Sequence, residues 1–139
     1  MDQKKLSSCY CKNIRRLSNK VTKYYNNYLE GTGLTLNQYS ILSSIQKIQP
    51  ATVTEIAEKA GLERTTIVRD LKPLFREGLI ADISEASKRD KKIVVTDKGN
   101  DLHDQAEPYW DEAQKNIYDL LGEKKFQEFV EILNILVEL

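Results

Sequence analysis

Two short helices separated by one glycine are the feature of this sequence that most constrains its fold. Residues 52–60 open with Thr and carry Glu three positions later, a capping-box pattern that predicts a helix breaking at Gly61. A second helix is expected over about 63–77, where apolar residues recur at steps of three and four. A helix-turn-helix needs a small residue, a turn glycine and a branched apolar anchor, and Ala57, Gly61 and Ile67 occupy these positions.

The outward side of the second helix has the chemistry of a DNA-reading surface. Arginine pairs with guanine through two hydrogen bonds, and threonine reaches a phosphate or the thymine methyl group. The residues expected on this side are Arg64, Thr65, Thr66, Arg69 and Lys72. The competing interpretation is ordinary packing of two short helices.

A β-hairpin is expected directly after these helices. Two β-type runs, 79–83 and 93–95, are separated by a long basic loop, which carries Lys88, Arg89, Lys91 and Lys92. A basic hairpin in this position is the wing of a winged helix-turn-helix, and its tip reaches phosphates or a narrow minor groove. A solvated charged turn is the alternative.

The rest of the chain is predicted to be helical, so the fold class is mainly α with a small β-hairpin. Apolar residues at one-face spacing predict a helix over 6–28, ended by Gly31 and Gly33, and a capping box at Thr35 opens another that Pro50 stops. A helix over 97–121 is separated by a glycine from a last helix. The residues expected to face inward on that last helix are Phe126, Phe129, Val130, Leu133 and Val137.

The formal net charge of zero conceals an uneven distribution. The 21 basic and 21 acidic residues give +5 over residues 1–30, +2 over 31–96 and −7 over 97–139. Opposite charge at the two ends indicates that they pack together, within one chain or between copies. Solvated helix faces would give the same distribution.

Composition excludes several classes of protein. A length of 139 residues indicates one domain, and no window has the uninterrupted apolar run of a membrane span or a signal peptide, so we expect a cytoplasmic protein without membrane contact. Two cysteines and one histidine cannot supply a disulfide framework or a His-rich metal site. Phosphate loops, GxSxG and paired histidines are missing, and His103 is interpreted as a surface residue. We therefore expect no enzyme, cofactor or metal.

Nearly the whole chain resembles the MarR-type winged-helix transcriptional regulators. The matching segments are 9–22, 33–35, 63–74 and, most specifically, Glu77-Gly78-Leu79-Ile80 and Val95-Thr96-Asp97-Lys98-Gly99. The resemblance implies a homodimer in which residues 1–33 and 97–139 form dimerisation helices and 34–96 form the winged helix-turn-helix DNA-binding module. It assigns DNA reading to the outward residues of the second helix and wing contact to Arg89. The family's usual aspartate two positions before that arginine is replaced by Ser87.

The same resemblance implies a repressor that binds double-stranded DNA at palindromic operators and answers to a small aromatic or lipophilic effector. Tyr24, Tyr28, Tyr39 and Trp110 are candidates to line the effector pocket, although core packing explains the same spacing. Cys9 and Cys11 suit either a thiol-based oxidant-sensing repressor or inert buried positions. A winged-helix adaptor for protein contacts is the third alternative, which the basic surfaces disfavour.

Overall fold

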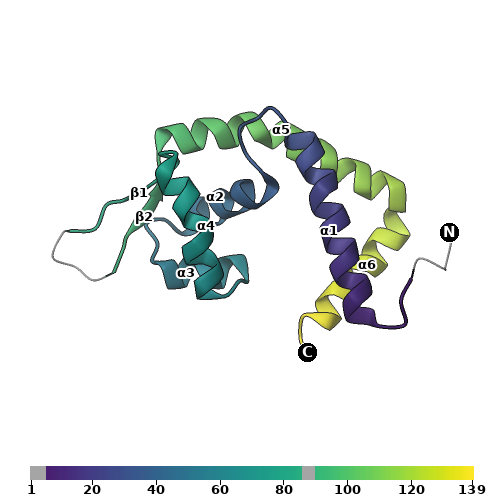
Figure 1. The fold of residues 1–139 in the computed structure, drawn as a ribbon. Coiled ribbons are helices and arrows are strands. Elements are labelled where there is room, and N and C mark those ends of the chain that lie inside the picture. Colours follow the sequence, from purple (N-terminus) through teal and green to yellow (C-terminus); the bar gives the residue numbers. More distant parts are fainter. Residues whose placement is uncertain (1–5, 86–89) are drawn as a thin grey trace.

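The computed structural model describes residues 6–85 and 90–139 (Figure 1). The chain order is α1 (Tyr10–Leu29), α2 (Leu36–Ile48), α3 (Val53–Ala60), α4 (Arg64–Arg76), β1 (Ile80–Asp82), β2 (Ile93–Val95), α5 (Asp97–Leu121) and α6 (Glu123–Leu136). The predicted fold class, mainly α with one small hairpin in a winged helix-turn-helix, is confirmed. Two of the predicted wing residues, Lys88 and Arg89, lie outside the described residues, as does Ser87.

Local sequence signals place the helices of the 34–96 module. Thr35 and Thr52 each accept a hydrogen bond from the backbone N–H three residues later, and the side chains at those later positions accept one in return, which completes both predicted capping boxes. Gly61 ends α3 with a φ of 69°, in the left-handed region that glycine adopts without steric cost. The Leu62 N–H donates to the Ala57 carbonyl across this turn, which brings α4 directly after α3.

A single hydrophobic core lies between α2, α3, α4, the hairpin and the first half of α5. Its most enclosed side chains include Leu42, Ile45, Ile56, Ile67, Leu74, Leu79 and Ile93. β1 and β2 pair antiparallel, with Ile80 opposite Val95, and Ala51 adds two backbone hydrogen bonds to Ile93. The hairpin is therefore hydrogen-bonded to the rest of the module along the β2 edge.

Gly99 fixes how closely α5 approaches the hairpin. A Cβ atom on this residue would lie 2.2 Å from the carbonyl oxygen of Leu79 and 2.7 Å from Cγ1 of Val95. The Thr96 side chain caps α5 by accepting from the Gly99 N–H and donates to the Gly78 carbonyl. The beginning of α5 is thus joined to the turn that follows α4.

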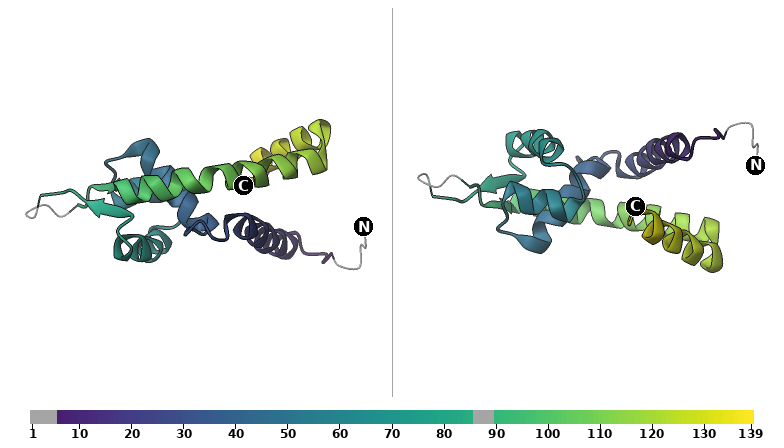
Figure 2. Two further views of the ribbon diagram at one scale, coloured as in Figure 1. Left: turned by 90° about the horizontal axis from the view of Figure 1, so that it is seen from above. Right: turned by 90° about the horizontal axis from the view of Figure 1, so that it is seen from below.

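The two ends of the chain form a separate arm. α5 runs from the module to the far end of the molecule, where α1 lies beside its second half and α6 folds back from it (Figures 1 and 2). The hydroxyl of Tyr24 donates to the Ala113 carbonyl over 3.1 Å, and Asn116 donates to the hydroxyl of Tyr28 over 2.6 Å. The expectation that the ends pack together is confirmed for α1 and α5.

The arm departs from the sequence prediction in two ways. α1 begins at Tyr10 rather than at residue 6, because Asn13 turns back and holds the backbone of Ser7 through two hydrogen bonds. None of the residues expected to face inward on α6 is buried, and Phe129, Leu133 and Val137 are 38%, 49% and 72% exposed. The prediction of an inward face is therefore wrong for a single chain.

Within residues 6–85 and 90–139, no helix combines the length and the apolar character required to cross a bilayer.

Candidate nucleic-acid interface

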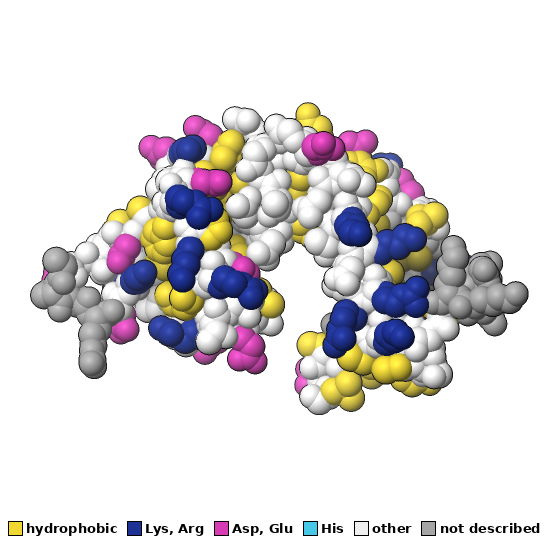
Figure 3. Space-filling model, in the orientation of Figure 1, with side chains coloured by type: hydrophobic (Ala, Val, Ile, Leu, Met, Phe, Trp, Pro, Cys, Tyr) yellow, Lys and Arg dark blue, Asp and Glu magenta, His cyan; other side chains and the backbone are white. Residues whose placement is uncertain are grey.

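α4 presents a polar, positively charged side to solvent. Its other side is buried through Ile67, Leu71 and Leu74, so α4 cannot rotate without opening the core. The residues predicted to face outward are exposed at Arg64, Thr65, Arg69 and Lys72, whereas Thr66 is half-buried. Lys and Arg side chains gather over this part of the molecule in the space-filling view (Figure 3).

A hydrogen-bonded pair connects the outward side of α4 to α2. Asn37 donates to Oδ2 of Asp70 over 3.2 Å, and Oδ1 of the same carboxylate lies 3.5 Å from Nε of Arg69. The Asp70 side chain is 18% exposed and that of Arg69 is 75% exposed. Asp70 therefore holds Nε of Arg69 close to the helix. The rest of the guanidinium extends into solvent, where a nucleobase or a phosphate can contact it.

The base of the wing is fixed by one carboxylate. Asp82 Oδ1 accepts hydrogen bonds from the backbone N–H groups of Ser84 and Lys92, which hold both strands at the point where the hairpin opens. A hydrogen bond from the Ser84 side chain, together with these two backbone bonds, lowers the pKa of Asp82 because all three stabilise its charged form. Lys91 and Lys92 are exposed, and the Lys91 ammonium lies 5.0 Å from the centroid of the Phe75 ring at the end of α4. The described part of the wing therefore adds positive charge beside α4.

The four aromatic residues predicted to line an effector pocket form two groups rather than one. Tyr24 and Tyr28 stack edge-to-face with ring centroids 5.1 Å apart and border an apolar pocket of about 440 Å³ between α1 and α5. Burial, together with the neighbouring Tyr28, raises the pKa of Tyr24 to about 12. This pocket lies in the arm, away from α4.

Tyr39 and Trp110 belong to the second group, at the junction between module and arm. The Tyr39 ring stacks on Trp110 and, with centroids 4.3 Å apart, on His103, and these three line a pocket of about 420 Å³ between α2 and α5. Burial and the carboxylates of Glu107 and Asp111 raise the pKa of Tyr39 to about 12, so its hydroxyl stays protonated. A molecule in this pocket would contact both the 34–96 module, through α2, and α5.

His103 was expected on the surface, and that prediction is wrong, since only 7% of the residue is exposed. Its Nε2 lies 2.7 Å from Oγ of Ser43, which itself donates to the Tyr39 carbonyl. Because the Ser43 proton is already committed, the imidazole donates from Nε2 to the hydroxyl oxygen. Burial lowers the pKa of His103, which favours the neutral ring.

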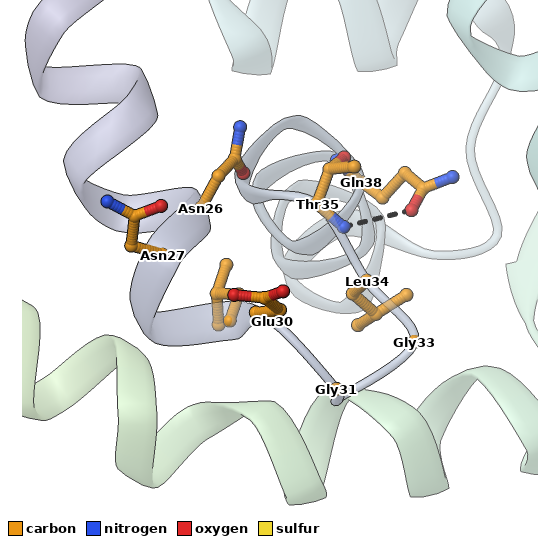
Figure 4. A pocket seen from close by; sticks show the side chains of 9 residues that line it. Asn26, Asn27, Glu30, Gly31, Gly33, Leu34, Thr35 and Gln38 are labelled. Carbon is orange, nitrogen blue, oxygen red and sulfur yellow. Dashed lines mark hydrogen bonds between the residues drawn. The ribbon is translucent and has the colours of Figure 1, made fainter.

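A third pocket, of about 490 Å³, lies where α1 meets α2 and was not foreseen from the sequence (Figure 4). Asn26, Asn27 and Glu30 at the end of α1 border it on one side, and Thr35 and Gln38 at the start of α2 border it on the other. Asn26 Oδ1 accepts from the Leu36 N–H over 2.7 Å, so a side chain of α1 holds the first residue of α2. The sequence signals at this place were the glycines Gly31 and Gly33, which end the first helix, and the capping box at Thr35.

Both cysteines are exposed thiols at the start of α1. Cys9 is the residue before the first turn, and Cys11 lies in that turn with its sulfur 3.9 Å from Nη2 of Arg15. The alternative in which they are buried and inert does not hold within this chain.

A sequence model of the MarR family matches residues 34–94, which lie within the predicted module of residues 34–96. The transcriptional regulator MosR of M. tuberculosis, solved in complex with DNA, is 30% identical, with a TM-score of 0.80 over 94% of this chain and 97% of that one. The repressor CouR, bound to a 23-mer DNA duplex, shares the fold at 22% identity, with a TM-score of 0.83 over 99% and 98% of the chains.

Curated relatives match over a shorter region. An HTH-type transcriptional regulator of Staphylococcus aureus is 35% identical over 77 residues, or 55% of this chain and 53% of the relative. The chain therefore spans about half the length of such curated relatives. The proteins named here are transcriptional regulators rather than enzymes.

Proposed function

Because the chain belongs to the MarR family of winged helix-turn-helix regulators, we propose that it represses transcription as a homodimer bound to a palindromic operator. The resemblance identified in the sequence is confirmed at the level of the family. For this chain we propose repression, a homodimer, a small effector and action in the cytoplasm.

The observation that carries the proposal is the outward side of α4. This side exposes Arg64, Arg69 and Lys72, while the opposite side of the helix is buried in the core. The positively charged start of the wing lies beside it. This arrangement suits α4 for the major groove and the wing for the flanking backbone. A protein adaptor would have no evident need for this charge.

The dimer is proposed from the apolar surface of the arm. Large side chains remain exposed on one stripe of α1 and along α5 and α6, namely Tyr10, Ile14, Leu17, Leu120, Ile132, Ile135 and Val137. Contiguous apolar surface of this extent is unfavourable in water and typically marks a protein interface. A second copy supplies a matching apolar surface, and a symmetric dimer would present two α4 helices to major grooves about 34 Å apart.

We further propose that a small aromatic or lipophilic effector releases the DNA. The pocket bordered by Tyr39, His103 and Trp110 joins the module to α5, so a ligand bound there contacts both parts. A ligand that prefers a dimer with a different spacing of the α4 helices shifts the population toward that state. An unchanged spacing in the crystal structure of the liganded dimer would contradict this mechanism.

The test of DNA binding is a fluorescence-anisotropy titration on the DNA upstream of the protein's own gene, against a scrambled duplex and at two salt concentrations. We expect tight binding that prefers the native fragment and weakens steeply with salt, because phosphate contacts release counterions. Arg64→Ala and Arg69→Ala should each weaken it, whereas Lys124→Ala on α6 should not. Equal weak binding to both duplexes, unaltered in the α4 variants, would contradict the proposal.

The exposure of Cys9 and Cys11 favours one second candidate, an oxidant-sensing repressor. Side chains two residues apart on a helix point in nearly opposite directions, so a disulfide would more readily join two subunits than close within one. Peroxide should then release DNA from the wild type but not from the Cys9→Ser/Cys11→Ser variant, and nonreducing electrophoresis should show a covalent dimer. Equal DNA binding before and after oxidation would remove this candidate.

A further inference from the structure

α1 carries a second cationic surface that the DNA-reading interface does not include. The helix contains five Lys and Arg residues and no Asp or Glu. All five are exposed, and Lys12, Arg15 and Lys23 are called here the α1 cations. Lys20 is not included because it borders the apolar pocket between α1 and α5. Nη2 of Arg15 lies 3.9 Å from the Cys11 sulfur, and the other two α1 cations are lysines. An all-cationic helix in a chain of zero net charge indicates an anionic partner.

The α1 cations lie on the opposite side of the helix from its apolar stripe. A step of two residues turns an α-helix by about 200°, so Lys12 lies opposite Ile14 and Lys23 lies opposite Val21. The apolar side is the one that meets α5, where Tyr24 and Tyr28 form their hydrogen bonds. Docking against α5, and the proposed dimer contact along the same stripe, therefore leave the α1 cations available.

The α1 cations share a face of the molecule with α4. Seen from above and from below, α1 and α4 both lie on the same side of α5 (Figure 2). The space-filling view of that side shows Lys and Arg side chains gathered in two places, over α4 and over α1, with a hollow between them (Figure 3). One anionic polymer that crosses this face can contact both groups.

We propose that the α1 cations bind phosphates of the same DNA duplex that α4 reads, an inference that rests on the proposed function. In the proposed dimer, α1 lies nearer than α4 to the second copy, because α1 belongs to the arm that carries the exposed apolar surface. The phosphates it meets are therefore those between the two half-sites. Lysine is a compact point charge, so the contact adds affinity without reading sequence.

The acidic helices of a second copy are the competing partner, since residues 97–139 carry a charge of −7. The dimer stripe of α1 is its apolar side, however, and the α1 cations face away from it. DNA is therefore the occupant that the geometry favours, and the oligomeric state becomes a readout of the test.

The experiment compares the dependence of the DNA dissociation constant on salt in wild type, in the α1 variant Lys12→Gln/Lys23→Gln and in the matched control Lys124→Gln/Lys125→Gln on α6. For every phosphate that a lysine no longer neutralises, the salt slope should fall in magnitude by about 0.9. We expect a smaller slope in the α1 variant, an unchanged slope in the control, and an unchanged ratio of affinities for native and scrambled duplexes.

A modified duplex locates the contact. Methylphosphonates between the half-sites remove charge from the backbone there, and they should weaken wild-type binding while adding little to the loss in the α1 variant. Sedimentation at the assay concentrations should show the same oligomer for all three proteins.

Three outcomes would overturn the inference: a wild-type salt slope in the α1 variant, an equal loss in the α6 control, or dissociation of the α1 variant into monomers. If Arg64→Ala abolishes binding while the α1 variant behaves as wild type, only the inference about α1 fails. If wild-type protein binds neither duplex at low salt, the proposed function fails, and this inference fails with it.

Discussion

The winged module and the arm are both built from amphipathic helices, yet only the module completes a core of its own. Ile45, Ile56 and Leu74 in the module are wholly buried, whereas Leu120, Ile132 and Ile135 in the arm are more than half exposed. The difference follows from geometry, because the module packs α2, α3, α4, the hairpin and the first half of α5 around one core, whereas in the arm α1 and α6 each contact α5 and stand apart from each other (Figure 2). An apolar stripe thus indicates that a face becomes buried without revealing whether the same chain buries it.

The largest effect on the free energy of unfolding is expected when the same substitution is made once in the module and once in the arm. Ile45→Ala should lower the free energy of unfolding by about 2–5 kcal/mol, because it leaves a cavity in a closed core. Ile135→Ala, the same change at a residue 69% exposed, should cost less than about 0.5 kcal/mol in a monomer. Denaturant titrations measure both values, and repetition at several protein concentrations shows whether a dimer buries Ile135. Equal losses that do not vary with concentration would contradict the comparison.

A second prediction concerns the contact that joins the two regions. Gly99→Ala places a methyl group against the Leu79 carbonyl and Val95, and backbone cannot yield as a flexible side chain does. We expect a loss of about 1–3 kcal/mol in unfolding free energy, the usual cost of overpacking. Asp101→Ala, an exposed position two residues further along α5, is the control and should change little. A neutral Gly99→Ala would mean that the hairpin and α5 are not tightly joined.

Local signals explain why the module was predictable from sequence. The capping boxes at Thr35 and Thr52 and the glycine at residue 61 act within a few residues of themselves, so they fix helix ends whatever the tertiary context. The outward side of α4 followed from the spacing of its apolar residues, and four of the five side chains assigned to it are exposed. Thr66 is the exception, because it lies at the edge of the buried stripe.

Distant contacts explain what the sequence did not reveal. His103 lies on a helix rich in acidic residues, but its burial depends on Tyr39 and Ser43, some 60 residues earlier. A signal was nevertheless available, since His103, Ala106, Trp110 and Ala113 recur at steps of three and four and form the inward stripe of α5. The split of the aromatic residues into two pockets had no such signal, because it depends on how α1 and α2 are placed around α5.

A smaller effect is expected at the junction of α1 and α2, where the arm meets the module. Thr35→Ala removes the side-chain oxygen that accepts from the Gln38 N–H and should cost about 1 kcal/mol in unfolding free energy. Thr54→Ala, at an exposed position inside α3, provides the matched control and should be neutral or slightly stabilising. Chemical denaturation measures both, and a neutral Thr35→Ala would show that α2 is positioned by its packing rather than by its cap.

The smallest effect is the pH dependence contributed by His103 at the junction of α2 and α5. Its ordinary pKa is about 6.5, and burial lowers the pKa in the folded protein although Glu107 and Asp104 act in the opposite direction. The unfolded chain therefore takes up a proton first as the pH falls, so this contribution is present above pH 6.5 and is lost below it. His103→Gln keeps a donor toward Ser43 but cannot titrate.

The difference in unfolding free energy between wild type and the His103→Gln variant should accordingly shrink from pH 7.5 to pH 5. A difference that stays constant, or grows in acid, would mean that the charged ring is accommodated where the module meets the arm, and the junction would then be less closed than the packing of Tyr39 on His103 indicates.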